Sequence, residues 1–258
     1  MGEEESSKEN VANRSQEGAL EKATEEEPLI SMPEQDVEGQ SFGWLLLHRR
    51  ELVFERIATS QDLGPMIRYF LGFSALFSAI YGSTLGFYSL NLQILLSAVK
   101  CPMLLLGTMA VCLPALFTFN VLLGSKLSFK QTTAMLSITT YLIATVLVSL
   151  APIELFFMIS TEGKHFVLLL NVAAFGISGV FGVKMLWGGM DYVIQRAGYP
   201  VNRRIIEIWS LIYMFVGTQL AWILRPFLGT PGEVVLYRKL GGNFYQAVFQ
   251  ATVDLIWR

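Results

Sequence analysis

Long apolar segments alternate with short polar ones over most of the chain after residue 68. A helix needs about 20 apolar residues to cross the hydrocarbon core of a bilayer, and five segments approach or reach that length. The expected spans are 69–90, 102–123, 133–153, 166–183 and 205–224. The pattern therefore predicts an all-α fold, a polytopic membrane helix bundle of about five transmembrane helices (69–224).

An amphipathic segment, 41–68, precedes the first span. Apolar side chains alternate there with arginine and glutamate, and Trp44 stands near its start. This pattern predicts a helix lying on the membrane surface, and the sequence DLGP at 62–65 is expected to end it. A shorter amphipathic segment, 91–99, is expected to lie in the membrane interface between the first two spans.

The chain after the fifth span, 225–258, is expected to form a structured cap. Two prolines and two glycines within 226–232 predict a rigid turn, and Asn243 followed by Gln246 fits a capping box that starts a helix. That helix is too short and too polar to cross a bilayer, so we expect it on the membrane surface or on a partner. The candidate interaction surface of this cap comprises Arg225, Pro226, Gly229, Pro231, Arg238, Asn243, Phe244 and Tyr245.

Composition agrees with a membrane protein. Hydrophobic residues make up 53% of the chain and charged residues 16%, against roughly 25% charged in ordinary soluble domains. The mean hydropathy is +0.48. Charge is also unevenly distributed, since residues 1–40 hold twelve acidic and three basic residues. Such a segment cannot bury enough apolar surface to fold, so it is expected to be a disordered acidic tail.

Lysine and arginine in short loops predict the orientation of a membrane protein, because the cytoplasmic side carries the excess. Ten of them fall on the side of the N-terminus and two on the other side, which places the N-terminus in the cytoplasm. The ten are Arg49, Arg50, Arg56, Arg68, Lys126, Lys130, Lys184, Arg196, Arg203 and Arg204, and the two are Lys100 and Lys164. Five spans then put the C-terminus outside. The alternative is a re-entrant fifth segment, which would return the C-terminus to the cytoplasm.

Small residues recur at every fourth position of two spans. In lipid, helices associate through close backbone approach at small residues, because the bilayer offers no hydrophobic gain on contact. The pattern predicts packing between helices of one chain, with dimerisation as the alternative. The helix-packing candidates are Ser74, Ser78, Gly82, Gly86, Ser178 and Gly182.

Ionisable residues inside spans are functional candidates by default, and here they are few and peripheral. Glu154 lies near the end of the third span, where it is expected to extend toward the interface. A transporter needs polar groups along a path, and the candidates for such a path are Asn120, Glu154 and Asn171. An acid–base pair of Glu154 with His165 at the outer face is a weaker hypothesis, because two such residues are usually only polar neighbours.

The sequence predicts no enzyme. It contains neither HExxH nor GxSxG, and its cysteines and histidines lack metal-ligand spacing. Cys101 and Cys112 would be about 16 Å apart on one helix, too far for a disulfide. We therefore expect no catalytic residue, metal or cofactor, and no nucleic-acid partner.

Several short motifs resemble those of Yip1-like membrane proteins, which have five spans behind a polar N-terminal segment. DLGP at 62–65 is similar to the DLYGP that precedes their first span, although the tyrosine is missing, and Tyr81-Gly82 and LLGS at 122–125 add to the likeness. The stretch 62–258 also resembles uncharacterised bacterial multi-span proteins with an RPFxGxP turn and a GNF(Y/F)xAV segment. The resemblance implies a membrane scaffold or adaptor without a catalytic site, in a bacterial inner membrane rather than a eukaryotic endomembrane.

The expected function is a scaffold or anchor that docks a partner assembly at the membrane. The alternative is a transporter or channel subunit that uses the polar path. The expected partners are the lipid bilayer and a protein or assembly of unknown identity, with a homo-oligomer as one option.

Overall fold

The structure is a computed structural model that describes residues 40–87, 92–122, 127–161, 164–196, 203–224 and 244–256. Residues from Phe42 onward form one compact unit. Nearly all of the expected acidic tail lies outside the described residues. So do 225–243, which include six of the eight residues of the expected C-terminal interaction surface.

The described part of the chain consists of helices and their connections, with no strand. The helices are α2 (Phe42–His48), α3 (Arg50–Ala58), α4 (Leu63–Gly86), α5 (Gln93–Leu122), α6 (Phe129–Ser160), α7 (Lys164–Arg196), α8 (Arg203–Leu224) and α9 (Phe244–Ile256). Five of these, α4 to α8, are long and apolar enough to cross a membrane. The prediction of an all-α bundle with five apolar spans is confirmed.

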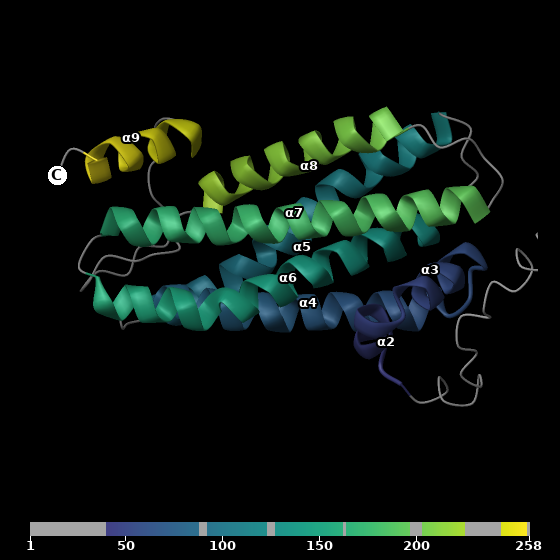
Figure 1. Cartoon of the computed structure of the whole chain (residues 1–258), viewed down its shortest axis with the longest axis horizontal. Coiled ribbons are helices and arrows are strands. Elements are labelled where there is room, and N and C mark those ends of the chain that lie inside the picture. Colours follow the sequence, from purple (N-terminus) through teal and green to yellow (C-terminus); the bar gives the residue numbers. More distant parts are fainter. Residues whose placement is uncertain are drawn as a thin grey trace, which may run out of the picture. The chain divides into compact units, whose positions relative to one another are not determined.

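The long helices run side by side (Figure 1). Helix α4 packs against both α5 and α6, α7 packs against α6, and α8 packs mainly against α5. The short helices lie at opposite ends of this bundle. α2 and α3 pack near the start of α4, whereas α9 lies beside α7 and α8 (Figure 1).

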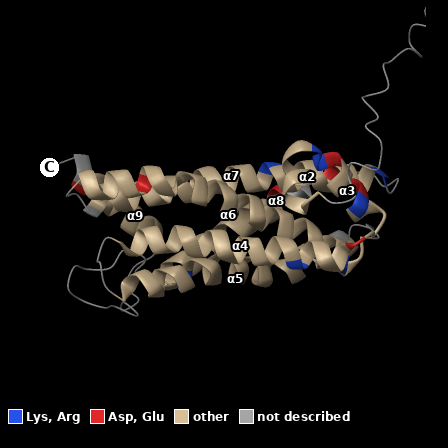
Figure 2. Ribbon diagram, turned by 90° about the horizontal axis from the view of Figure 1, so that it is seen from below, with Lys and Arg blue, Asp and Glu red and all other residues tan. Residues whose placement is uncertain are grey.

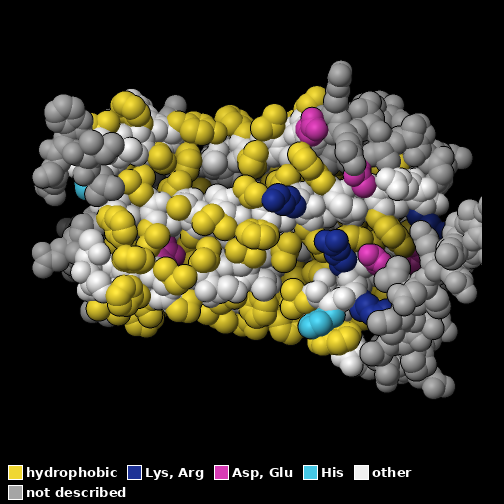
Figure 3. Space-filling view, viewed as in Figure 1, with side chains coloured by type: hydrophobic (Ala, Val, Ile, Leu, Met, Phe, Trp, Pro, Cys, Tyr) yellow, Lys and Arg dark blue, Asp and Glu magenta, His cyan; other side chains and the backbone are white. Residues whose placement is uncertain are grey.

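The outer surface of the bundle is apolar. Each long helix exposes large hydrophobic side chains, for example Leu76, Met103, Phe156, Phe181 and Leu211. Figure 3 shows hydrophobic side chains spread over the face of the bundle that is seen in Figure 1. Figure 2 shows charged residues concentrated at the end that carries α2 and α3. A soluble bundle rarely exposes apolar surface on this scale, so the surface fits a lipid environment.

Helix α5 begins earlier than expected. The segment 91–99, expected in the membrane interface, contributes the first turns of α5 from Gln93 onward. Its polar residues Gln93 and Ser97 are fully buried. They face α4, where Gly82 and Gly86 have no side chain and leave room for the α5 backbone. The polar side of this amphipathic pattern therefore packs against α4.

The DLGP sequence starts a helix instead of ending one. Asp62 adopts the left-handed conformation (φ 50°), and α4 begins at the next residue. Pro65 falls in the first turn of α4. Backbone N–H groups of a first turn make no hydrogen bond within the helix, so the N–H that proline lacks is not needed there. The expected surface helix over 41–68 is therefore two short helices, which meet at Arg49, followed by the first turn of the first span.

The apolar face of α2 and α3 is buried against the bundle. Leu45, Val53 and Ile57 are almost completely covered, with α2 on α4 and α3 on α6 and α7. The amphipathic pattern was correctly identified, but this face contacts protein rather than lipid.

Helix α8 is continuous over its 22 residues, which favours a span over the re-entrant hairpin. Two tryptophans hold it in place. The buried Trp209 donates from Nε1 to the Cys112 carbonyl of α5 (3.4 Å), and Trp187 of α7 donates to Ser210 Oγ (2.9 Å).

Candidate functional site

Glu154 is the most unusual polar residue of the bundle. It lies on α6 with its side chain 1% exposed, and among the described residues neither carboxyl oxygen has a hydrogen-bond partner. Its neighbours explain the burial, because Ile153 and Phe156 face outward whereas Ala151 and Met158 share the buried side of α6 with Glu154. The expectation that this side chain extends to the interface is therefore wrong.

Tyr81 lies near this carboxyl group and is hydrogen-bonded to Asn171. The fully buried Tyr81 of α4 donates its hydroxyl hydrogen to Asn171 Oδ1 of α7 at 2.7 Å. Its ring packs edge-on against Phe175. The same hydroxyl is close enough to interact electrostatically with the Glu154 carboxyl group, although the two do not reach hydrogen-bond geometry.

Helix α5 completes the cluster through a glycine contact. A Cβ atom on Gly82 would overlap the Ser97 carbonyl oxygen and would lie 2.8 Å from Cβ of Cys101. The close approach that glycine permits brings the buried, free Cys101 thiol into electrostatic range of Glu154. Four helices thus contribute to what we call the buried polar cluster: Tyr81, Cys101, Glu154 and Asn171.

The buried polar cluster lies inside the bundle but nearer to the α9 end. Tyr81 is five residues before the end of α4, Glu154 six before the end of α6, and Asn171 seven after the start of α7. At 1.5 Å per residue, each is roughly 8–11 Å from the end of its helix. The start of α7 is also where α9 packs.

The expected polar path is only partly assembled. Asn171 and Glu154 both lie near the Tyr81 hydroxyl. Asn120, however, lies 19 residues after Cys101 on α5, which is about 28 Å along a helix axis. The Asn120 side chain is outside the described part of the structure. Sequence reasoning also missed Tyr81 as a polar member of the site. Its position beside Gly82 in the small-residue stripe was the available signal.

Glu154 and His165 do not form the acid–base pair considered from the sequence. His165 pairs instead with Asp254 of α9, with Nδ1 and Oδ2 3.9 Å apart, and both side chains are about half exposed. Glu154 points instead into the helix interface.

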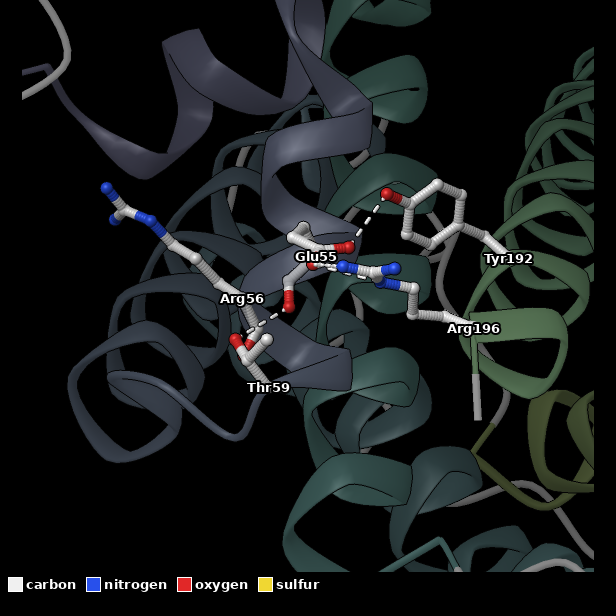
Figure 4. A network of polar contacts seen from close by, with 5 residues as sticks. All are labelled: Glu55, Arg56, Thr59, Tyr192 and Arg196. Atoms are coloured by element: carbon white, nitrogen blue, oxygen red, sulfur yellow. Dashed lines mark hydrogen bonds and ion pairs between the residues drawn. The ribbon is translucent and has the colours of Figure 1, made fainter. Parts of the chain in front are cut away.

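A second polar cluster attaches α3 to the end of α7 (Figure 4). Tyr192 donates its hydroxyl hydrogen to Glu55 Oε2 (2.9 Å), and Arg196 donates from Nε and Nη2 to Oε1 (3.1 and 3.0 Å). The hydrogen bond from Tyr192, together with Arg196, lowers the pKa of the Glu55 carboxyl group. Thr59 donates to the Glu55 carbonyl at the end of α3 (2.8 Å). We call Glu55, Tyr192 and Arg196 the α3 clamp.

Gln131 attaches the other side of α3. Its Nε2 donates to the carbonyls of Ile57 (2.9 Å) and Ala58 (3.2 Å), which belong to the last turn of α3, where carbonyls lack the usual helical partners. The Gln131 Oε1 atom accepts from the Ser128 backbone as part of a capping box. One side chain therefore starts α6 and fixes the end of α3.

The small-residue stripes contact helices of the same chain. Gly82 and Gly86 lie against the α5 backbone, and a Cβ on Gly182 would lie 2.5 Å from Ile143 of α6. The hydroxyls of the buried Ser74, Ser78 and Ser178 donate to carbonyls four residues earlier. The stripes let the backbones of α4 and α5, and of α7 and α6, approach closely.

Of the expected C-terminal interaction surface, the structure describes Phe244 and Tyr245 on α9. Tyr245 is 51% exposed, and its hydroxyl lies 3.4 Å from Thr218 Oγ1 of α8. The rings of Phe244 and Tyr245 pack edge to face. The other six residues, Arg225, Pro226, Gly229, Pro231, Arg238 and Asn243, lie outside the described residues.

Within the described part of the chain, no group of three His, Cys, Asp or Glu side chains could hold a metal ion. Comparisons with family models, curated proteins and solved structures find no match. The resemblance to Yip1-like proteins therefore stays a prediction.

Proposed function

We propose that this multi-pass membrane protein is a non-catalytic scaffold or anchor that holds a partner assembly at the membrane. The observation that supports this most is the rigid attachment of α2 and α3 to one end of the bundle. The α3 clamp fixes one side, Gln131 fixes the end of α3, and the apolar inner face is buried. The segment is thereby presented in a fixed orientation.

The outer face of α2 and α3 is suited to a protein partner. We define it as Trp44, Leu47, Arg50 and Glu51, all of which are exposed. Trp44 is 41% and Leu47 63% exposed, and the Trp44 ring stacks on His48 with centroids 4.6 Å apart. Tryptophan and arginine are the residues that most often dominate binding energy in protein interfaces. We infer that a partner buries the two apolar side chains and pairs with the flanking charges.

We place this end of the bundle in the cytoplasm of a bacterial cell, with the protein in the inner membrane. Two lysines used in the sequence prediction lie well inside helices, Lys100 seven residues after the start of α5 and Lys184 twelve residues before the end of α7. Both helices extend beyond the apolar segments expected from the sequence. Without these lysines, the loops between spans and the N-terminal flank leave nine basic residues on the N-terminal side and one on the other. With the four basic residues after α8 included, the count is nine against five, so the orientation stays the same.

Purification in a mild detergent tests the scaffold proposal. The wild-type chain should retain a stoichiometric companion protein, and the double variant Trp44→Ala/Leu47→Ala should lose it. The matched control is Leu95→Ala/Val99→Ala, which removes two exposed apolar side chains from α5 and should retain the companion. Recovery of the wild-type protein without any companion would contradict the proposal.

The second candidate function is a transporter or channel subunit. The observation that favours it is the buried polar cluster, because an ionisable side chain among membrane helices usually marks a pathway for a substrate or ion. The test is solute and ion flux in proteoliposomes with Asn120, Glu154 and Asn171 replaced by alanine. Flux equal to that of the wild-type protein would eliminate this function.

A further inference from the structure

Within the described part of the structure, the Glu154 carboxyl group has no charged partner that could stabilise it as an anion. Among the described residues, the titratable groups that face it are the Tyr81 hydroxyl from α4 and the Cys101 thiol from α5. Helix α7 presents the neutral Asn171. Neither ion pair of the described residues, His165–Asp254 or Arg196–Glu55, includes Glu154. Since an unpaired buried charge is costly, the geometry calls for a bound positive species at this carboxyl group.

We propose that Glu154 is a proton-binding site, and that the Tyr81 hydroxyl exchanges its hydrogen-bond acceptor between Asn171 and Glu154 when the proton binds or leaves. The inference goes beyond the scaffold proposal and does not depend on it. It also does not require that the protein carries a solute, because a proton site can serve a conformational change as well as transport.

The observed arrangement fits the proton-loaded state. Tyr81 donates its hydrogen to Asn171 Oδ1 at 2.7 Å, so its oxygen lone pairs are free to accept. With a small shift of either side chain, the O–H of protonated Glu154 can donate to the Tyr81 oxygen. The result is a chain of two hydrogen bonds, from Glu154 to Tyr81 to Asn171, that links α6, α4 and α7.

Release of the proton reverses this chain without changing any other charge. The O–H bond of Glu154 breaks, the electron pair stays on the carboxylate, and water takes the proton. Tyr81 then turns its O–H toward the carboxylate, and the Asn171 amide turns so that its NH₂ group donates to the Tyr81 oxygen. Two hydrogen bonds exist before and after, and the one to the carboxylate is the stronger because its acceptor is charged.

The exchange of the proton should take place with the α9 side of the bundle. The three residues of the hydrogen-bond chain lie roughly 8–11 Å from the helix ends on that side, whereas α4, α6 and α7 extend much farther in the other direction. The exposed pair of His165 and Asp254 lies on the same side, where α9 meets α7.

Labelling with dicyclohexylcarbodiimide tests the proposal, because this hydrophobic reagent adds to protonated carboxyl groups in apolar surroundings. The full-length protein in lipid nanodiscs is treated over a range of pH, and the adduct is located by peptide mass spectrometry. The expected result is an adduct on Glu154 whose yield falls as the pH rises. If the correctly folded wild-type protein gives no adduct on Glu154 at any pH, the proposal is overturned. This labelling experiment requires no variant.

Two variants and an infrared measurement refine the test. Glu154→Gln, which keeps the size of the side chain, should lose both the adduct and the infrared carbonyl band of a protonated carboxylic acid. Cys112→Ala removes the other buried thiol of α5, which lies outside the buried polar cluster, and should keep both. Tyr81→Phe should move the band to higher frequency, since the carboxylic acid loses its hydrogen-bond acceptor. If Glu154→Gln retains the wild-type band, the band does not come from Glu154 and the proposal is contradicted. If Tyr81→Phe leaves the band at its wild-type frequency, the proposed hydrogen bond from Glu154 to Tyr81 is contradicted.

Discussion

Glu55 shows how one side chain fixes a surface helix at the end of a membrane bundle. Its two carboxyl oxygens have separate partners, Tyr192 for Oε2 and Arg196 for Oε1. Both partners stabilise the ionised form, which is why the pKa of Glu55 is lowered. The side chain remains 31% exposed, so water screens the interaction, and its importance lies in orientation more than in overall stability.

The attachment of α3 should therefore depend on pH. A carboxyl group whose pKa is lower in the folded state contributes stability above its unfolded pKa, and this contribution is lost as the pH falls through the folded value. Glu55→Gln should let the α3 amides exchange with deuterium a few-fold faster than in the wild type at neutral pH. The difference should disappear in acid. Glu51→Gln on the same helix is the control, and equal effects of both substitutions at neutral pH would argue against the clamp.

The interface between α4 and α5 is determined by glycine at two turns. A Cβ on Gly82 or Gly86 would overlap the α5 backbone, and backbone cannot move aside as a flexible side chain can. Gly176 of α7, by contrast, has no atom within 4 Å of an added Cβ. The two kinds of glycine look alike in the sequence but differ in what they contact.

Alanine substitution should separate these two kinds of glycine. Gly82→Ala should destabilise the bundle by about 1–3 kcal/mol, the usual range for overpacking a well-packed contact. Gly176→Ala should be neutral or stabilising by up to ~1 kcal/mol, because alanine favours a helix. Thermal unfolding in the same detergent measures both. Equal effects of the two substitutions would mean that the α4–α5 contact is not close in the membrane.

On the scale of the whole molecule, five spans place the chain before α4 and the chain after α8 on opposite sides of the membrane. The α2–α3 end and the α9 end are far apart along the long helices (Figure 1). A protein of this design presents one rigid surface to each compartment. The proposed partner site and the proposed proton site then lie toward different sides.

Labelling of single cysteines checks this arrangement. In a background with Cys101 and Cys112 replaced by alanine, Tyr245→Cys on α9 should react with a membrane-impermeant maleimide in intact cells. Thr59→Cys at the end of α3 should react only after permeabilisation. Both native residues are exposed, so access to reagent is not limited by burial. Reaction of both cysteines from the same side would contradict an odd number of spans.

The sequence alone was enough to predict the all-α bundle and the existence of five apolar helices. This is because the bilayer requires about 20 apolar residues per span, a local property that any window of the chain reveals. The stripe of small residues on α4 was also visible, since its period of four is a property of a single helix. The expected ends of the helices were less accurate. Segment 91–99 and the DLGP sequence have local patterns that fit either a helix start or an interfacial segment.

The sequence offered Glu154 and Asn171 as polar candidates, but their grouping with Tyr81 and Cys101 could not be predicted, because it depends on which faces of four helices meet. The sequence places Glu154 near the end of a span, from which its side chain has the reach to approach the interface. Only the packing of α4 and α7 against α6 decides that it faces inward, next to Tyr81 and Asn171. Asn120 has the same polarity as Asn171 but belongs to a distant turn. Local composition determines which segments enter the membrane, whereas the contacts between helices determine which polar groups meet there.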